Sequence, residues 1–292
     1  MSQPSIQIER GRWSDIALYA LCGFTAVTLI GYATFGVNPE LIAKVPGAAS
    51  VYSQAFRFFA LGNIWLAFLV FAVILTRRVG RQWLPSFLLL YSISLLSELS
   101  GTITGLPFGE YRYSEALDPM WFGHVPVVIP LSWFFMAVTS YGLARSVLGE
   151  RNTRVFRVLI ASALLVSWDL SLDPAMSFAT HYWMWGSVGA YYGMPWLNLF
   201  GWYVTGLALM SALALVDADR WIAWLSIRRL WIFYLANLAL PLAMNALAGL
   251  WGAVISSIVA ICGVLIVARR LAVASALEEV RRLHSGPPIR AA

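Results

Sequence analysis

The chain has 292 residues, of which 60% are hydrophobic and 12% are charged, and its formal net charge is +6. Soluble domains are charged at about a quarter of their positions, so this composition excludes an ordinary soluble protein and predicts an integral membrane protein. The positive charge does not indicate nucleic-acid binding, because the basic residues are distributed among short segments between apolar runs.

Eight apolar segments are long enough to cross a bilayer, which takes about 20 residues. They cover residues 14–36, 55–76, 84–104, 125–148, 155–172, 196–216, 230–247 and 250–271. The last two are the least distinct, because Asn245, Gly249 and Gly252 around their junction allow a tight turn without requiring one. We expect an all-α polytopic membrane protein with about eight transmembrane helices. Residues 1–271 would form a single transmembrane helical domain and residues 272–292 a cytoplasmic tail, helical at first and then disordered.

The Lys and Arg residues predict the orientation, since cytoplasmic segments of membrane proteins are enriched in both. With eight spans and a cytoplasmic N-terminus, 17 of them fall inside and only Lys44, Arg57 and Arg112 fall outside. Both termini are therefore expected in the cytoplasm, and the protein in a bacterial or archaeal cell membrane. Membrane lipid is its expected surrounding.

Two of the outer segments differ from ordinary solvated loops. Residues 105–126 and 173–195 are rich in aromatic residues, Gly and Pro, and nearly free of Lys. We expect these irregular segments to fold back into the interface or to close the mouth of the helical bundle, because irregular backbone at membrane depth must be buried in protein or line a cavity.

Glu98 is the clearest functional candidate inside a span, because ionisable groups in a membrane are costly. It lies about two helical turns from the outer end of segment 84–104, and Gly101, Thr102 and Gly105 share its helical face. The pattern indicates either a smooth groove with one carboxyl or a helix-packing face with a hydrogen-bonded Glu.

Asp169 and Asp173 lie near the outer end of segment 155–172, four residues apart, so both should occupy one helical face. Pro174 is expected to end the helix just beyond them. Two close carboxyls in a poorly hydrated place should not both ionise, and one would stay protonated near neutral pH. The pair would then supply an acid and a base. The alternative is simple polar termination of a helix.

Other polar residues give weaker signals. Asn198 either orients a water or a carboxyl, or serves packing; Glu110 either contacts substrate or pairs with Arg112. His181 is either a proton shuttle or a hydrogen-bonded interface residue. The clustered aromatic candidates for a pocket wall are Phe108, Tyr111, Trp168, Trp183 and Trp185.

Several reaction classes are disfavoured by what the sequence lacks. Three scattered His residues cannot supply the His-rich boxes of a membrane di-iron enzyme, and no Gly-rich nucleotide or phosphate loop occurs. A prenyl-transferring enzyme would need a second acidic motif beside Asp169 and Asp173. We therefore expect no metal and no cofactor.

Three stretches in this order and spacing resemble the carotenoid biosynthesis family of membrane proteins, which includes carotenoid 1′,2′-hydratases and bisanhydrobacterioruberin hydratase. The first covers residues 98–113 and ends in Gly-Leu-Pro-Phe-Gly-Glu-Tyr-Arg-Tyr. The second covers residues 169–176, Asp-Leu-Ser-Leu-Asp-Pro-Ala-Met. The third covers residues 183–202 and contains Trp-Met-Trp-Gly, Tyr-Tyr-Gly-Met-Pro-Trp-Leu-Asn and Gly-Trp. The resemblance covers about a third of the chain.

The resemblance implies a cofactor-free hydro-lyase that adds water to the terminal double bond of an acyclic (ψ) carotenoid end group. A lycopene-like or other ψ-ended carotenoid would be the substrate, and other carotenoid biosynthesis enzymes are candidate partners. We expect Asp169 and Asp173 to donate the proton, and Glu98 with Asn198 to position the water, although the two roles could be exchanged. The alternatives are a carotenoid- or lipid-binding scaffold, a transporter, or an intramembrane prenyl-transferring enzyme.

Overall fold

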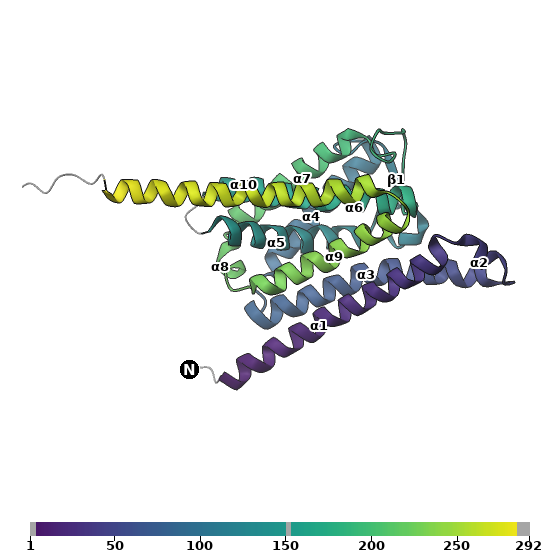
Figure 1. Ribbon diagram of the computed structural model, residues 1–292, viewed down its shortest axis with the longest axis horizontal. Helices are drawn as coiled ribbons and strands as arrows, with labels where there is room; N and C mark the ends of the chain where they lie inside the picture. The colour runs from purple at the N-terminus through teal and green to yellow at the C-terminus, as the bar shows by residue number, and fades with distance from the viewer. Residues whose placement is uncertain (1–3, 150–152, 285–292) are drawn as a thin grey trace, which may run out of the picture.

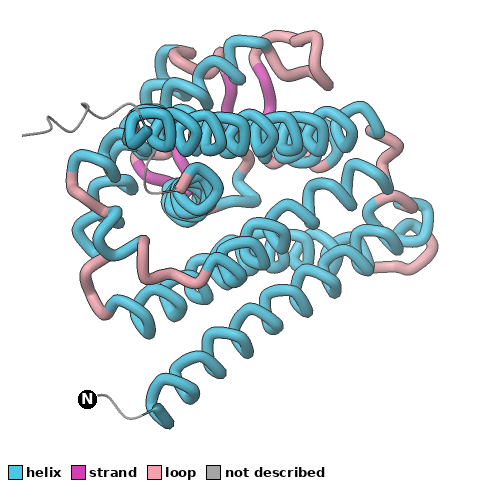
Figure 2. Tube along the Cα trace, turned by 60° about the vertical axis from the view of Figure 1, so that its left-hand side comes forward, coloured by secondary structure: helices cyan, strands magenta, loops and turns pink. Residues whose placement is uncertain are grey.

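A computed structural model describes residues 4–149 and 153–284, and in this part of the chain the architecture is a bundle of eight long helices (Figure 1). The long helices are α1 (Pro4–Gly31), α3 (Ala48–Val79), α4 (Leu84–Thr104), α5 (Ile129–Leu148), α6 (Arg154–Asp173), α7 (Trp196–Leu215), α9 (Ile227–Leu247) and α10 (Trp251–His284). Two short helices, α2 (Pro39–Ala43) and α8 (Asp219–Ile222), lie in connections. The strands, magenta in Figure 2, are β1 (Tyr111–Tyr113), β2 (Met120–Trp121), β3 (Val125–Pro126) and β4 (Trp183–Trp185).

The chain is an all-α polytopic membrane protein, as the composition predicted. Seven helices among the described residues are long and apolar enough to cross a membrane, and α5 is the long helix that does not meet this criterion. The reason is its position: α5 contacts α3, α4, α6, α7, α9 and α10, and every residue from Trp133 to Ala144 is buried. A helix enclosed by other helices can carry Ser, Thr and Tyr because its side chains meet protein and not lipid.

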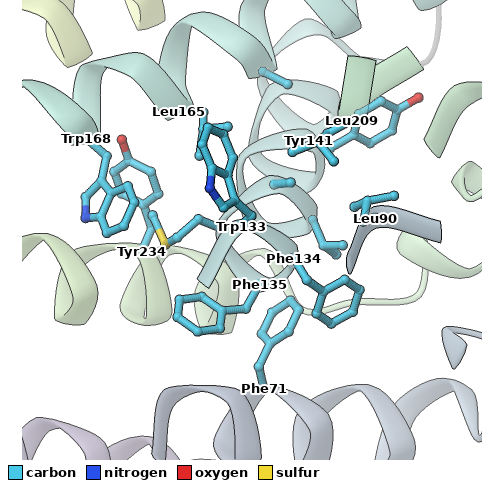
Figure 3. Close-up of a cluster of buried hydrophobic side chains, with 14 of the residues drawn as sticks. Phe71, Leu90, Trp133, Phe134, Phe135, Tyr141, Leu165, Trp168, Leu209 and Tyr234 are labelled. Carbon is cyan, nitrogen blue, oxygen red and sulfur yellow. The ribbon is translucent and has the colours of Figure 1, made fainter. Parts of the chain in front are cut away.

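The hydrophobic core is centred on α5. Trp133, Phe134 and Phe135 project from successive positions of this helix into the cluster drawn in Figure 3, which also includes Phe71 of α3 and Tyr234 of α9. By contrast, α4 exposes a row of large apolar side chains, including Leu88, Leu96 and Ile103, each more than 60% exposed. These residues lie on one face of the helix, as expected of a surface in contact with lipid.

The two ends of the bundle differ in composition. One end, at the left of Figure 1, holds the start of α1, the end of α10 and α8, together with Arg77, Arg78, Arg145, Arg154 and Arg220; we call it the arginine end. The other, the aromatic end, carries β1 and the segments that surround it. The charge count assigned these arginines to one side, and the fold does bring them to one end; which side of the membrane this end faces stays a prediction.

The aromatic end is closed by residues 105–128 and 180–195, which we call the aromatic cap. Strands β1 and β4 pair antiparallel with Tyr111 opposite Trp185 and Tyr113 opposite Trp183, and β2 pairs with β3. Backbone hydrogen bonds from Ser114 to Tyr182 and from Gly186 to Glu110 extend the first pairing at both ends. The cap thus satisfies its own backbone and closes the mouth of the bundle, as the sequence predicted.

Three local expectations need correction. The segment expected to be helical from residue 125 begins with β3, and α5 starts only at Ile129. The α-helix α6 ends at Asp173, as Pro174 predicted, but the helical path does not stop there. The chain continues as a π-helix, Pro174–Ala179, since proline cannot donate to the α-helical ladder and a wider turn takes over. Cys22 and Cys262 each lie inside an apolar run, which predicts that both are buried in apolar surroundings, but both are exposed on the apolar surface of the bundle.

Other expectations are confirmed. Helices α9 and α10 are separate, with a turn at residues 248–250 in which Gly249 has a φ of +75°, a conformation that favours glycine. The helical start of the tail is also confirmed, since α10 continues to His284. Residues 285–292 lie outside the described residues.

Candidate active site

Glu98 is held by three side-chain donors at the aromatic end of α4. The Tyr111 hydroxyl donates to Oε2, the Tyr113 hydroxyl donates to the same oxygen at 2.8 Å, and Trp133 Nε1 donates to Oε1 at 2.7 Å. Glu98 is 4% exposed. All three donors are neutral groups, and together they fix both oxygens of a carboxyl that has little contact with solvent.

The groove predicted beside Glu98 is filled by the aromatic cap. A Cβ atom at Gly101 would lie 2.7 Å from the Phe108 ring and 3.0 Å from the Tyr111 hydroxyl. Gly201 of α7 is equally close to Phe108, at 2.6 Å. These two glycines let the cap descend between α4 and α7, which brings the Tyr111 hydroxyl to Glu98.

Asp169 and Asp173 occupy one face of α6, as their spacing predicted, and both are nearly inaccessible. Asn198 of α7 joins them, because its Nδ2 atom donates to Asp173 Oδ2 and lies 3.4 Å from Asp169 Oδ2. Trp183 Nε1 donates to the other oxygen of Asp173 at 2.8 Å. Asp169 Oδ1 is buried and has no hydrogen-bond partner among the described residues.

The carboxyls of Glu98 and Asp173 face a common small cavity of about 40 Å³, which we call the carboxyl pocket. Its wall consists mainly of aromatic side chains together with Asn198; the lining residues are Glu98, Phe108, Tyr111, Tyr113, Ile129, Ser132, Trp133, Leu172, Asp173, Trp183, Trp185, Asn198 and Trp202. Trp133 and Trp202 stack with ring centroids 4.0 Å apart. The pocket has room for about one water molecule, whose share of liquid volume is about 30 Å³.

A larger cavity of about 270 Å³, the apolar cavity, lies next to the carboxyl pocket. It is enclosed by α1, α3, α5, α6 and α9, and its rim includes Phe35, which is 44% exposed. The two cavities share four lining residues, Ile129, Ser132, Leu172 and Trp183, which we call the junction. An apolar molecule in the larger cavity could therefore present one end to the carboxyls.

Among the described residues, no cation offsets these carboxyls. Within the described ranges, neither Glu98 nor Asp169 nor Asp173 has a Lys, Arg or His within ion-pair distance. Burial, together with the nearby Glu98 carboxyl, raises the pKa of Tyr111 and of Tyr113 well above the usual range of tyrosine. Both phenols therefore stay neutral and remain hydrogen-bond donors near neutral pH.

The structure brings together most of the residues singled out from the sequence. Glu98, Asp173, Asn198, Phe108, Tyr111, Trp183 and Trp185 line the carboxyl pocket, and Asp169 lies behind Asp173. Trp168 lines the apolar cavity, where its Nε1 atom donates to the Asn237 carbonyl oxygen. His181 and Glu110 line neither cavity: His181 is exposed, and Glu110 packs against Gly186. The expected pairing of Glu110 with Arg112 is not among the ion pairs of the described residues.

Sequence reasoning missed Tyr113, Trp133, Trp202 and Ser132. Tyr113 could have been found, because alternation along a strand puts it on the same face as Tyr111. Trp133 gave no such signal, since nothing in its local sequence places it beside Glu98, which is 35 residues earlier. Among the described residues, no group of three or more His, Cys, Asp or Glu side chains could hold a metal ion.

Comparisons with known proteins cover all of these residues. The model of a family described as carotenoid biosynthesis protein matches residues 59–264. A bisanhydrobacterioruberin hydratase from Haloarcula japonica is 32% identical to the chain over 200 residues, which make up 68% of this chain and 63% of that relative. The match thus spans less than two thirds of the relative's length. No solved structure was found to match the chain.

Proposed function

Because the chain belongs to the carotenoid biosynthesis protein family, we propose that it is a carotenoid hydratase, which adds water to the terminal 1′,2′ double bond of an acyclic (ψ) end group. One observation carries the proposal: buried carboxyls that have no cationic partner among the described residues line a pocket, and this pocket adjoins an apolar cavity enclosed by long apolar helices. The name of the Haloarcula japonica relative supports the same reaction class.

The chemistry requires this combination of groups. An unactivated alkene is protonated only by an acid in a poorly hydrated place, and Asp169 and Asp173 together hold such a proton. Asp173, the member of the pair that lines the pocket, transfers it to C2′. The π electrons form the new C–H bond and leave a tertiary cation at C1′, which the faces of Trp133, Trp183 and Trp202 surround and stabilise.

Glu98 completes the addition. A water molecule in the carboxyl pocket forms the C–O bond at C1′ and releases a proton to the Glu98 carboxylate, so that one H₂O is added and no electrons are exchanged. Three donors orient Glu98 for this role. Asn198 contacts the aspartates and not Glu98, so in this proposal it aligns the acid rather than the water.

The apolar cavity would hold the part of the polyene next to the reacting end. Its volume of about 270 Å³ is near the lower limit of ligand pockets, which is about 300 Å³. The end group would lie at the junction, facing the water in the carboxyl pocket, and the rest of the chain would extend past Phe35 into lipid. In the orientation predicted from the charge count, the reaction takes place near the outer leaflet of the cell membrane.

The proposal is tested by expressing the full chain in a lycopene-producing host and determining pigment masses. A product heavier by one water supports it, provided that the Asp173→Asn variant, present in membranes at the same level, gives none. Unchanged pigment with lycopene and with several other ψ-ended carotenoids would overturn the proposal. Carotenoid that copurifies unchanged with the protein would then favour a binding scaffold.

A further inference from the structure

The β1–β4 ribbon presents four aromatic side chains with polar groups to the carboxyl pocket. Tyr111 and Tyr113 alternate along β1, Trp183 and Trp185 alternate along β4, and the register pairs each Tyr with a Trp. Alternation along a strand puts these four side chains on one face of the ribbon, with Arg112 and Met184 on the other.

Three of the four polar groups have a carboxyl partner. The two hydroxyls donate to Glu98, and Trp183 Nε1 donates to Asp173. The fourth, Trp185 Nε1, is buried and has no hydrogen-bond partner within the described part of the chain. A buried, unpaired donor costs about 1–3 kcal/mol, so its retention beside the reacting groups needs an explanation.

Trp185 is well placed to meet an oxygen in the pocket. Its ring lies 5.5 Å from the Tyr111 ring, centroid to centroid, and Tyr111 is one of the residues whose hydroxyl donates to Glu98. An indole N–H can only donate, so its partner must be an acceptor. In a hydration, the oxygen atoms that enter this pocket are those of the water and of the product alcohol.

We infer that Trp185 is a catalytic residue whose indole N–H binds the oxygen of the water that adds to C1′ and then the hydroxyl of the product. This inference rests on the proposed hydratase function. Glu98 accepts one hydrogen of that water and Trp185 donates to its oxygen, so a lone pair is left to form the bond to carbon. The indole ring also forms part of the aromatic wall of the pocket. The two roles can be separated, because phenylalanine retains an aromatic ring but has no N–H group.

The role of the N–H group predicts a change in the fate of the cation. Once C2′ is protonated, the cation either captures water or loses a proton from C2′ and returns to the alkene. In D₂O the acid delivers a deuteron, so C2′ of the cation carries one hydrogen and one deuterium. A return that removes the original hydrogen leaves a deuterium at C2′ of the unhydrated carotenoid, and a return that removes the deuteron leaves no label. A residue that positions water changes the ratio of these two products, whereas a purely structural residue lowers both together.

The experiment uses the full chain in membranes in D₂O buffer, supplied with a ψ-ended carotenoid that the unaltered protein hydrates. Trp185→Phe should lower hydration by about 10- to 100-fold and raise the ratio of deuterated alkene to alcohol by a similar factor, the scale of losing one hydrogen bond. The matched control is Trp224→Phe, the same substitution at a side chain 65% exposed at the arginine end, which should leave both products unchanged.

The outcomes distinguish a failure of the Trp185 inference from a failure of the hydratase proposal. If the unaltered protein hydrates the carotenoid and Trp185→Phe keeps the same product ratio, Trp185 is only part of the wall and the inference is wrong. The same holds if both products fall in parallel. If the unaltered protein forms neither product, the hydratase proposal itself fails. Should Trp185→Phe not fold, Trp185→His, which retains a ring N–H, is compared in its place. A ratio of deuterated alkene to alcohol close to that of Trp224→Phe again supports the inference. Alcohol formation no higher than in membranes without the protein overturns it.

Discussion

Carboxyl groups with several side-chain partners lie at both ends of the bundle, but those partners differ. At the arginine end, Asp219 is 2.5 Å from Arg157 and also within 4 Å of Arg145 and Arg154. Tyr141 adds a hydrogen bond. At the aromatic end, Glu98 and Asp173 are held by Tyr, Trp and Asn side chains, and no cation reaches them in the described residues.

This difference separates a structural carboxyl from a reactive one. Asp219 ties α8 to the end of α5 and the start of α6 through ion pairs with three arginines, which is a structural cross-link. A carboxyl surrounded by neutral donors keeps its orientation yet can exist with or without its proton. Acid–base chemistry requires this freedom, and the carboxyls at the aromatic end have neutral donors of this kind.

The largest expected effect is on the proton donor. Asp173→Asn keeps the size of the side chain and removes the acidic proton, so turnover should fall by about 1,000-fold, within the usual range for general acids. The measurement is the initial rate of alcohol formation per folded molecule. The same substitution at the other end, Asp219→Asn, serves as the control. Undiminished turnover in folded Asp173→Asn would remove this residue from the mechanism.

Asp219→Asn should instead affect stability. It leaves Arg157, which is 5% exposed, without its close carboxyl partner. Breaking a fully buried ion pair costs about 3 kcal/mol, and the 16% exposure of the Asp219 side chain brings the expected loss below that value. Denaturation in detergent should detect this loss, while the turnover of the folded fraction changes by less than about twofold. Asp217→Asn, at a partly exposed ion pair, should cost no more than about 1 kcal/mol. If the unaltered protein, Asp217→Asn and Asp219→Asn were equally stable, the structural role of Asp219 would be contradicted.

Glu98→Gln tests the acceptor of the water proton. The amide cannot take up a proton, and it turns an NH₂ group toward side chains that are themselves donors. Turnover should fall by about 100-fold, with most of the loss in kcat and little in KM, because the residue acts on the water and not on the polyene. A loss confined to KM would assign Glu98 to substrate binding.

The smallest effect is expected at Tyr113. Tyr113→Phe removes one of the three donors to Glu98 and leaves Tyr111 and Trp133 in place. A loss of about tenfold in kcat corresponds to about 1.4 kcal/mol, the scale of one hydrogen bond. Tyr19→Phe, at a side chain 62% exposed on α1, provides the matched control. A larger loss than that of Glu98→Gln would show that the tyrosine has a role independent of Glu98.

The helices could be predicted well because the information is local. A run of about 20 apolar residues predicts a span wherever it occurs, and the spacing of Asp169 and Asp173 put both on one face before any packing was known. The exceptions are also informative. Enclosure of α5 by six helices and the π-helical turn at Pro174 depend on neighbours that no local pattern encodes.

The amino-acid sequence by itself determined that this is a membrane protein, that its arginines gather at one end, and that Glu98, Asp169 and Asp173 lie toward the other. Hydropathy, charge and helical spacing are properties of short segments, and they survive folding unchanged. Only the tertiary structure decided the partners of these carboxyls. Trp133 reaches Glu98 from another helix, Asn198 joins the aspartates, and the register of β1 on β4 leaves the Trp185 N–H group unpaired. Such contacts depend on how distant segments pack. The sequence alone places these carboxyls inside membrane spans. The fold adds that they have no cation as partner among the described residues and that they lie near an apolar cavity.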